Sequence, residues 1–187
     1  MSDFLKGVNL YLIGMMGAGK TTVGKILATQ LGYRYIDTDD FIEKVAGISI
    51  AEMFDRDGEE AFRQLETQVL AELSAYRRCV IATGGGIVIR QMNWSYLHHG
   101  IVAWLDVPVD ELYRRLQGDT TRPLLAHPDP QAKLQTLLNQ RESRYRQADA
   151  RVVVEPGQPP EQIATRTLDE VKKALKSSPQ KGGADRN

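Results

Sequence analysis

Short apolar runs alternate along the chain with stretches whose apolar residues recur at helical spacing. The apolar runs predict strands, and they are 8–13, 33–36, 79–82, 101–105 and 151–154. Alternating strands and helices are typical of parallel strands joined by right-handed crossovers. Three of these runs are continuously apolar, which indicates strands buried on both faces. The pattern therefore predicts an α/β fold, a three-layer sandwich with about five parallel strands.

The stretches between the strands carry start and stop signals for helices. The first helix is expected to begin near Lys20 and to end at Gly32, and a short second helix stops at Gly47. Residues 49–52 form a capping box, in which the serine oxygen accepts a hydrogen bond from a free backbone amide. A longer helix follows Gly58. Later helices are expected near 90–97, after 108, around 131–147 and over about 160–176.

The composition is that of one ordinary globular domain. Of 187 residues, 42% are hydrophobic and 26% charged, which excludes wholesale disorder. Lysine plus arginine number 24 and aspartate plus glutamate 24, and this balance argues against a general nucleic-acid binder. We expect a single domain over 1–176 and a disordered tail over 177–187.

Cys79 is the only cysteine, so no internal disulfide is possible and a reducing, cytoplasmic location is expected. The uncharged stretch 7–19 is too short for a membrane span and is broken by glycines. We therefore expect a cytoplasmic protein that associates with neither membrane nor nucleic acid, and we expect it to be a monomer.

Residues 14–21 match the P-loop pattern G-x-x-x-x-G-K-[ST], between a predicted strand and a predicted helix. Glycines let successive backbone amides surround a phosphate, and the helix N-terminus adds positive potential. Lys20 can reach the β- and γ-phosphates of ATP, and the Thr21 hydroxyl can ligate Mg²⁺. The alternative is a glycine turn that binds nothing.

A P-loop alone does not separate kinases from other nucleotide-binding proteins. A GTPase should carry a guanine-reading N-K-x-D segment, which the sequence lacks. A large motor ATPase would need a longer chain. A small kinase needs a polar pocket for its acceptor and a way to keep water from the γ-phosphate, so the remaining polar motifs decide between these classes.

Asp37 and Asp39 follow the second predicted strand, at the edge where ligands of open parallel sheets gather. One carboxylate could hold a magnesium-bound water, and the other could orient or deprotonate the attacking hydroxyl. The alternative is that Asp39 or Asp40 caps the next helix. The glycines 84–86 follow the third strand at the same edge and either bring backbone amides close to a ligand or form a flexible turn.

Several arginines are candidates for binding anions. Arg63 borders a buried helical stripe and either leans over a cleft or pairs in solvent with a glutamate, Glu59 or Glu66. Arg141 lies one helical turn before Tyr145 on a later helix and is a further candidate.

The long loop at 118–130 breaks the alternation of strands and helices. It contains Arg122 and three prolines, and it either folds over ATP as a mobile lid or is a plain surface excursion. Arg114 and Arg115, just before this loop, are expected to face solvent.

Taken together, these motifs resemble the shikimate kinase family from about Leu5 to Leu175. The resemblance rests on residues 14–22, 37–39, 62–66, 82–86 and 122–125, and on Arg141 with Tyr145. It implies the fold of nucleoside monophosphate kinases. It also implies transfer of the ATP γ-phosphate to the 3-hydroxyl of shikimate, a step of aromatic amino-acid synthesis.

The resemblance also implies roles for individual residues. Lys20 would hold the phosphates, Asp39 would be the base, and Arg122 would reach ATP from the lid. Thr21 and Asp37 would bind Mg²⁺, the aspartate through water. The expected nucleotide contacts are Gly17, Ala18, Gly19, Lys20, Thr21, Thr22, Arg122 and Gln158. The expected acceptor contacts are Asp37, Asp39, Arg63, Gly84, Gly85, Gly86 and Arg141.

Two alternatives to a shikimate kinase remain open from the sequence. One is another small hydroxy-acid kinase, such as a gluconate-type kinase. The other is a kinase-like nucleotide-binding module that has lost catalysis and acts as a regulator. The presence of Lys20, Asp39 and Arg63 argues against the second.

Overall fold

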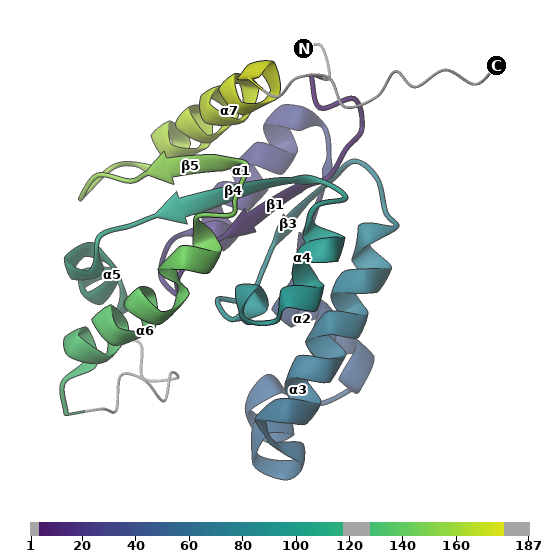
Figure 1. The fold of residues 1–187 in the computed structure, drawn as a ribbon, viewed down its shortest axis with the longest axis vertical. Helices are drawn as coiled ribbons and strands as arrows, with labels where there is room; N and C mark the ends of the chain where they lie inside the picture. The colour runs from purple at the N-terminus through teal and green to yellow at the C-terminus, as the bar shows by residue number, and fades with distance from the viewer. Residues whose placement is uncertain (1–3, 118–127, 178–187) are drawn as a thin grey trace.

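The computed structural model describes residues 4–117 and 128–177, and its centre is a five-stranded parallel sheet (Figure 1). The strand order is β2-β3-β1-β4-β5. Pairs of neighbouring strands are parallel throughout. The strands are β1 (Leu10–Ile13), β2 (Arg34–Asp37), β3 (Cys79–Ala82), β4 (Ile101–Asp106) and β5 (Ala150–Val153). The predicted three-layer α/β fold is confirmed.

Helices cover both faces of this sheet. On one face α1 (Lys20–Leu31) packs against α7 (Pro160–Ser177), and on the other α3 (Ile50–Ser74) packs against α4 (Gln91–Leu97), as Figure 1 shows. The remaining elements are α2 (Thr38–Ala46), the short 3₁₀ helix η1 (Ile87–Ile89), α5 (Val109–Leu116) and α6 (Pro130–Tyr145). None of the helices among the described residues combines the length and the apolar character that a membrane crossing requires.

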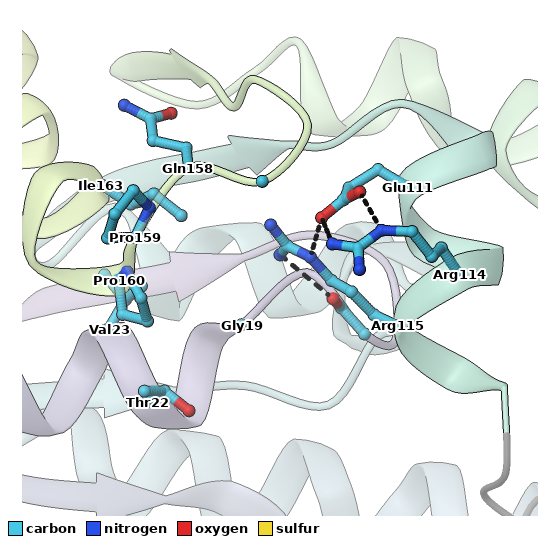
Figure 2. Close-up of a pocket in the computed structure, with 12 residues that line it drawn as sticks. Gly19, Thr22, Val23, Glu111, Arg114, Arg115, Gln158, Pro159, Pro160 and Ile163 are labelled. Carbon is cyan, nitrogen blue, oxygen red and sulfur yellow. Dashed lines mark hydrogen bonds and ion pairs between the residues drawn. The ribbon is translucent and has the colours of Figure 1, made fainter.

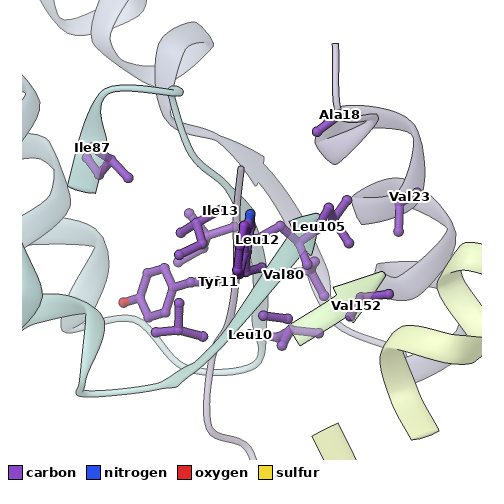
Figure 3. Close-up of a cluster of buried hydrophobic side chains, with 14 of the residues drawn as sticks. Leu10, Tyr11, Leu12, Ile13, Ala18, Val23, Val80, Ile87, Leu105 and Val152 are labelled. Atoms are coloured by element: carbon purple, nitrogen blue, oxygen red, sulfur yellow. The ribbon is translucent and has the colours of Figure 1, made fainter. Parts of the chain in front are cut away.

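The three continuously apolar runs are the inner strands of the sheet. Every residue of β1 and β3 is buried, and β4 is exposed only in part at its two ends. The outer strands differ, because β5 alternates buried and exposed residues and β2 is nowhere fully buried. Inner strands have helices on both faces, so they need apolar side chains in both directions. Figure 3 shows the resulting core around β1, to which residues of β3, β4 and β5 also contribute.

Helix ends follow the predicted signals closely. Gly32 and Gly47 end α1 and α2 in the left-handed conformation, at φ 65° and 71°. Ser49 caps α3, since its hydroxyl accepts a hydrogen bond from the Glu52 amide at 3.2 Å. Gly58, at φ 82° and ψ 172°, interrupts α3 at the point where the sequence predicts a second helical segment.

The predicted lid and tail are only marginally covered by the structure. Of the loop 118–130, residues 118–127 lie outside the described residues, so Arg122 and the expected lid are not tested. The last helix extends to Ser177, one residue into the expected tail, and 178–187 also lie outside the described residues.

The carboxyl edge of the sheet gathers the polar motifs. Strand β1 lies between β3 and β4. The connection after β1 leads to the side of the sheet that holds β2 and β3, and the connection after β3 leads to the other side, which holds β4 and β5. Such a switch point opens a crevice in which parallel α/β proteins bind their ligands. The loops that follow β1, β2 and β3 carry the P-loop, the two aspartates and the glycine triplet, and all three meet there.

Candidate active site

The P-loop connects β1 to α1, the context that the sequence predicts. Gly14 has φ 144°, and a Cβ atom on it would lie 2.7 Å from the carbonyl oxygen of Leu105, so the loop requires glycine there. The Lys20 side chain is nearly buried, and its ammonium group donates to the carbonyl oxygens of Gly14 and Met15, both at 2.8 Å. Lysine is thus held over the loop whose amides can surround a phosphate.

Two cavities adjoin the P-loop and share Gly17, Gly19 and Arg115. One, of about 370 Å³, contains the acidic and glycine-rich motifs. Its lining includes Lys20, Thr21, Asp37, Asp39, Gly84 and Gly85. The other, of about 340 Å³, extends toward the start of α7 (Figure 2). Its lining includes Thr22, Val23, Gln158, Pro159, Pro160 and Ile163.

The predicted nucleotide contacts divide between these cavities. Thr22 and Gln158 line the second cavity, which we name the nucleoside cavity, and Lys20 and Thr21 line the first, which we name the acceptor cavity. The side chain of Ala18 is fully buried in the core, so only its backbone can face a nucleotide. The P-loop therefore lies between two spaces, as a bound triphosphate with an acceptor beyond its last phosphate would require.

Thr21 and Asp37 form a pair of oxygen donors beside Lys20. The Thr21 hydroxyl donates to Asp37 Oδ2 at 3.1 Å, and the Tyr35 hydroxyl donates to the same oxygen at 3.1 Å. Burial, followed by the charge of Asp37, raises the pKa of Tyr35, so the phenol keeps its proton. Mg²⁺ prefers carboxylate and hydroxyl oxygens and is usually held by only one or two protein groups plus phosphates. The pair fits such an ion.

Asp37 also caps the second helix. Its Oδ1 accepts a hydrogen bond from the Asp39 amide at 3.0 Å. The alternative in which Asp39 or Asp40 caps α2 is therefore wrong, because β2 extends to Asp37 and the helix begins directly after it. This leaves the Asp39 carboxylate available for another task.

Asp39 lines the acceptor cavity, and one of its carboxylate oxygens is unpaired. Within the described part of the chain, its Oδ1 is buried and has no hydrogen-bond partner. Burial, followed by repulsion from Asp37, raises the pKa of Asp39. A Cβ atom on Gly84 would lie 2.8 Å from this oxygen and 3.2 Å from Glu66 Oε1. Glycine at 84 thus allows two carboxylates to approach the loop after β3.

Arg63 lies beside Gly86, outside the lining of the acceptor cavity, and is held there by carboxylates. It donates to Glu66 at 2.9 Å and to Glu59 at 3.3 Å, and only 13% of its side chain is exposed. The pairing expected in the solvent alternative is confirmed, but the solvent location is wrong, since Arg63 is mostly buried. Its guanidinium group lies against Gly86, where a side chain would collide with it.

Substitution of Gly86 by alanine tests this close approach. The added methyl group would lie 2.6 Å from Arg63 Nη2, so the guanidinium group must move. We expect Gly86→Ala to raise the KM for the acceptor about 10-fold, the lower range for losing a charge-assisted hydrogen bond, and to leave the KM for ATP nearly unchanged. Steady-state kinetics on both substrates measure this. An equal rise in the KM for ATP would contradict a local effect on the acceptor.

Arg141 and Tyr145, both on α6, donate hydrogen bonds to the glycine triplet. Arg141 Nη1 donates to the Gly85 carbonyl oxygen at 3.2 Å, and the Tyr145 hydroxyl donates to the same oxygen at 2.8 Å. The Tyr145 ring stacks on Trp104 of β4 with centroids 5.6 Å apart. Arg141, 56 positions after Gly85 in the chain, is thereby brought beside the acceptor cavity, which Gly85 lines.

Arg115 is a site residue that the sequence analysis missed. Only 21% of its side chain is exposed, and its Nη1 donates to the carbonyl oxygens of Ala18 at 3.3 Å and Gly17 at 3.5 Å. The expectation that Arg115 faces solvent is wrong. The same expectation for Arg114 is confirmed, because 62% of its side chain is exposed. One signal in the sequence could have indicated this position: Glu111 lies four residues before Arg115 on the same helix face, where the two side chains can pair.

A phosphate-binding loop with an acidic acceptor pocket on a five-stranded parallel sheet defines the chain as a small P-loop kinase. A family model described as "Shikimate kinase" matches residues 16–172. A curated shikimate kinase from Nostoc sp. is 56% identical over 95% of this chain and 98% of its own. One from Synechococcus elongatus is 56% identical over 93% and 92%. The chain belongs to the shikimate kinase family and is an ATP- and Mg²⁺-dependent kinase.

Solved structures agree with this assignment. A shikimate kinase from Acinetobacter baumannii, solved in complex with shikimate, has a TM-score of 0.84 and 39% identity, with 91% of this chain and 96% of that one covered. A gluconokinase from Sinorhizobium meliloti has a TM-score of 0.57 at 19% identity over 91% and 94%, which shows the shared fold alone.

Proposed function

We propose that this chain transfers the γ-phosphate of ATP to the 3-hydroxyl of shikimate, giving shikimate 3-phosphate and ADP. The observation that carries the proposal is the acceptor cavity, which Lys20 and Thr21 line from the P-loop, Asp39 from the start of α2 and Gly85 from the loop after β3. A transferring phosphoryl group and its acceptor can therefore meet without crossing solvent. Membership of the shikimate kinase family supports the choice of acceptor.

The nucleotide side consists of the P-loop and its neighbours. Lys20 contacts the β- and γ-phosphates, while the glycine amides between Gly14 and Lys20 surround them. Thr21 and Asp37 hold Mg²⁺, which neutralises charge on the phosphates when bound. The nucleoside cavity, with Thr22 and Gln158 in its lining, takes the rest of the nucleotide.

The acceptor side matches one carboxylate and several hydroxyl groups. Arg63 and Arg141 bind the shikimate carboxylate, because a planar guanidinium group pairs well with a carboxylate. Gly84, Gly85 and Gly86 let the substrate approach the backbone closely. Asp39 accepts hydrogen bonds from the substrate hydroxyls through its unpaired oxygen.

Asp39 also acts as the general base of the transfer. It takes the proton of the 3-hydroxyl as that oxygen forms its bond to the γ-phosphorus, and the bond from the γ-phosphorus to the bridging oxygen of ADP breaks. Its raised pKa makes it a better proton acceptor than an ordinary aspartate. Arg122, which lies outside the described residues, is assigned by family resemblance to the transferring phosphoryl group.

The decisive experiment is a coupled ADP-release assay with a panel of hydroxylated acids. We expect rapid ADP release with shikimate and only background release with gluconate. Release with gluconate at a similar rate would indicate the other small-metabolite kinase. Nucleotide binding without release for any acid would indicate the catalytically silent regulator.

Arg63→Ala directly tests whether Arg63 binds the shikimate carboxylate. It removes a charge-assisted pair with the substrate carboxylate, so the KM for shikimate should rise about 10- to 100-fold, with a much smaller change for ATP. Arg56→Ala is the matched control, since Arg56 is an exposed arginine of the same helix paired with Asp57 at 2.7 Å. If Arg63→Ala raised the KM for shikimate and the KM for ATP equally, the proposed contact of Arg63 with the shikimate carboxylate would be contradicted.

The proposal includes a monomeric enzyme in the cytoplasm that binds neither nucleic acid nor membrane. The free thiol of Cys79 is buried, and burial raises its pKa. Size-exclusion chromatography with light scattering measures the oligomeric state; a stable dimer would contradict this part.

A further inference from the structure

Glu111 is a buried carboxylate that holds two arginines on α5. Only 2% of its side chain is exposed. Arg114 donates to both carboxylate oxygens, at 2.8 Å each, and Arg115 Nε donates to Oε1 at 2.7 Å. Hydrogen bonds from Arg114 first, and then from Arg115, lower the pKa of Glu111 to about 2. The carboxylate therefore stays charged at neutral pH and binds both guanidinium groups strongly.

The two arginines form one wall of the nucleoside cavity. Figure 2 shows Glu111, Arg114 and Arg115 on one side of it, opposite Gln158 and Pro159. Arg115 also lines the acceptor cavity and donates to the P-loop carbonyl oxygens of Gly17 and Ala18. Glu111 is thus the one carboxylate in the described part of the chain that holds both guanidinium groups of this wall, and the P-loop holds Arg115 as well.

Ion pairs of this spacing on an exposed helix surface contribute little. Glu111 differs because it is buried and shared, and a buried charge without its partner is strongly unfavourable. Neutralising Glu111 would release two long side chains, which would then have to be ordered again whenever a nucleotide binds. Ordering flexible side chains on binding reduces affinity.

We propose that Glu111 is a positioning residue for the nucleotide, which acts by holding Arg114 and Arg115 as the wall of the nucleoside cavity. The inference rests on the proposed function only in taking the P-loop as the ATP site. It predicts that Glu111 affects nucleotide affinity far more than acceptor affinity. A carboxylate that only stabilised α5 would leave both affinities alone or lower them together.

Glu111→Gln tests this, because it keeps the shape of the side chain and removes its charge. We expect the dissociation constant for MgADP, measured by isothermal titration calorimetry, to rise about 10-fold or more. The KM for ATP should follow it, while the KM for shikimate stays within about twofold. Glu170→Gln is the matched control, since Glu170 pairs with Lys173 three residues later on α7 at 2.7 Å; it should leave MgADP binding unchanged.

A double variant separates positioning from folding. If Glu111 acts through Arg115, adding Glu111→Gln to Arg115→Ala should weaken MgADP binding less than it does in the wild-type background. Should Glu111→Gln fail to fold, Glu111→Asp keeps the charge but shortens its reach, and a smaller rise in the dissociation constant is expected. MgADP affinity equal to wild type in a folded Glu111 variant would overturn the proposal. Absent ADP release by the wild-type enzyme with shikimate would contradict the proposed function alone and leave the binding comparison valid.

Discussion

Asp39→Asn is expected to reduce kcat by about 10²- to 10⁴-fold, the usual contribution of a positioned general base. The substitution keeps the size of the side chain but removes its ability to take the 3-hydroxyl proton. Asp39, whose Oδ1 is buried and unpaired, lines the cavity that the P-loop also lines. Because Thr21, Asp37 and Lys20 are unchanged, the dissociation constant for MgADP should remain near that of the wild type.

We also predict the direction in which Asp39→Asn changes the stability of the fold. Burial raises the pKa of Asp39 in the folded chain, so the fold loses stability as the pH rises from the ordinary aspartate range through this raised pKa. Asparagine carries no charge and avoids this loss. We expect the melting temperature of Asp39→Asn at pH 7.5, a value chosen for the assay, to equal or exceed that of the wild type.

Asp40→Asn provides the matched control for both measurements. Asp40 is the exposed neighbour of Asp39 on α2, so this variant makes the same charge change one residue away from the cavity. It should retain wild-type kcat. Loss of activity in both variants would point to a general effect of charge at the start of α2 and would contradict the role of Asp39.

Lys20→Met is expected to lower kcat/KM for ATP by about 10²- to 10³-fold or more, the range for removing one preorganised electrostatic contact. Methionine fills similar space without the ammonium group that Gly14 and Met15 hold over the loop. The phosphates would lose the positive charge that this ammonium group provides against the negative charge of the transferring group. Steady-state kinetics with varied ATP measure the loss, and circular dichroism checks the fold.

Lys25→Met on the exposed side of the same helix is the control for this substitution. Its ammonium group lies 5.7 Å from the centroid of the Tyr35 ring and lines neither cavity beside the P-loop. We expect near-wild-type kinetics. Comparable losses in the two lysine variants would show that helix charge, rather than contact with phosphate, is responsible.

The sequence predicted the fold and the phosphate loop because both depend on local patterns. A run such as 79–82 is apolar at every position only where helices cover both faces of a strand, and the structure has β3 in the interior of the sheet. The P-loop needs a strand, a glycine turn and a helix that are contiguous in sequence. Its neighbours Asp37 and Asp39 follow from the rule that ligands gather at strand carboxyl ends.

Contacts that depend on how elements dock were harder to predict. Arg115 meets Ala18 across 97 positions of sequence, and only the pairing of β1 with β4 brings α5 to the P-loop. Which aspartate caps α2 depended on β2 extending one residue further than its apolar run indicates. Arg63 was ambiguous because spacing alone identifies its glutamate partners but not their burial.

The central claim is that one cavity brings the triphosphate and the hydroxy acid together for direct transfer. The most direct test is a crystal structure of the complex with MgADP and shikimate. The account predicts the shikimate carboxylate within about 3 Å of Arg63 and Arg141, and the 3-hydroxyl within hydrogen-bond distance of Asp39 and facing the β-phosphate of ADP. Shikimate bound away from this cavity, or with its 3-hydroxyl turned away from the nucleotide, would contradict it.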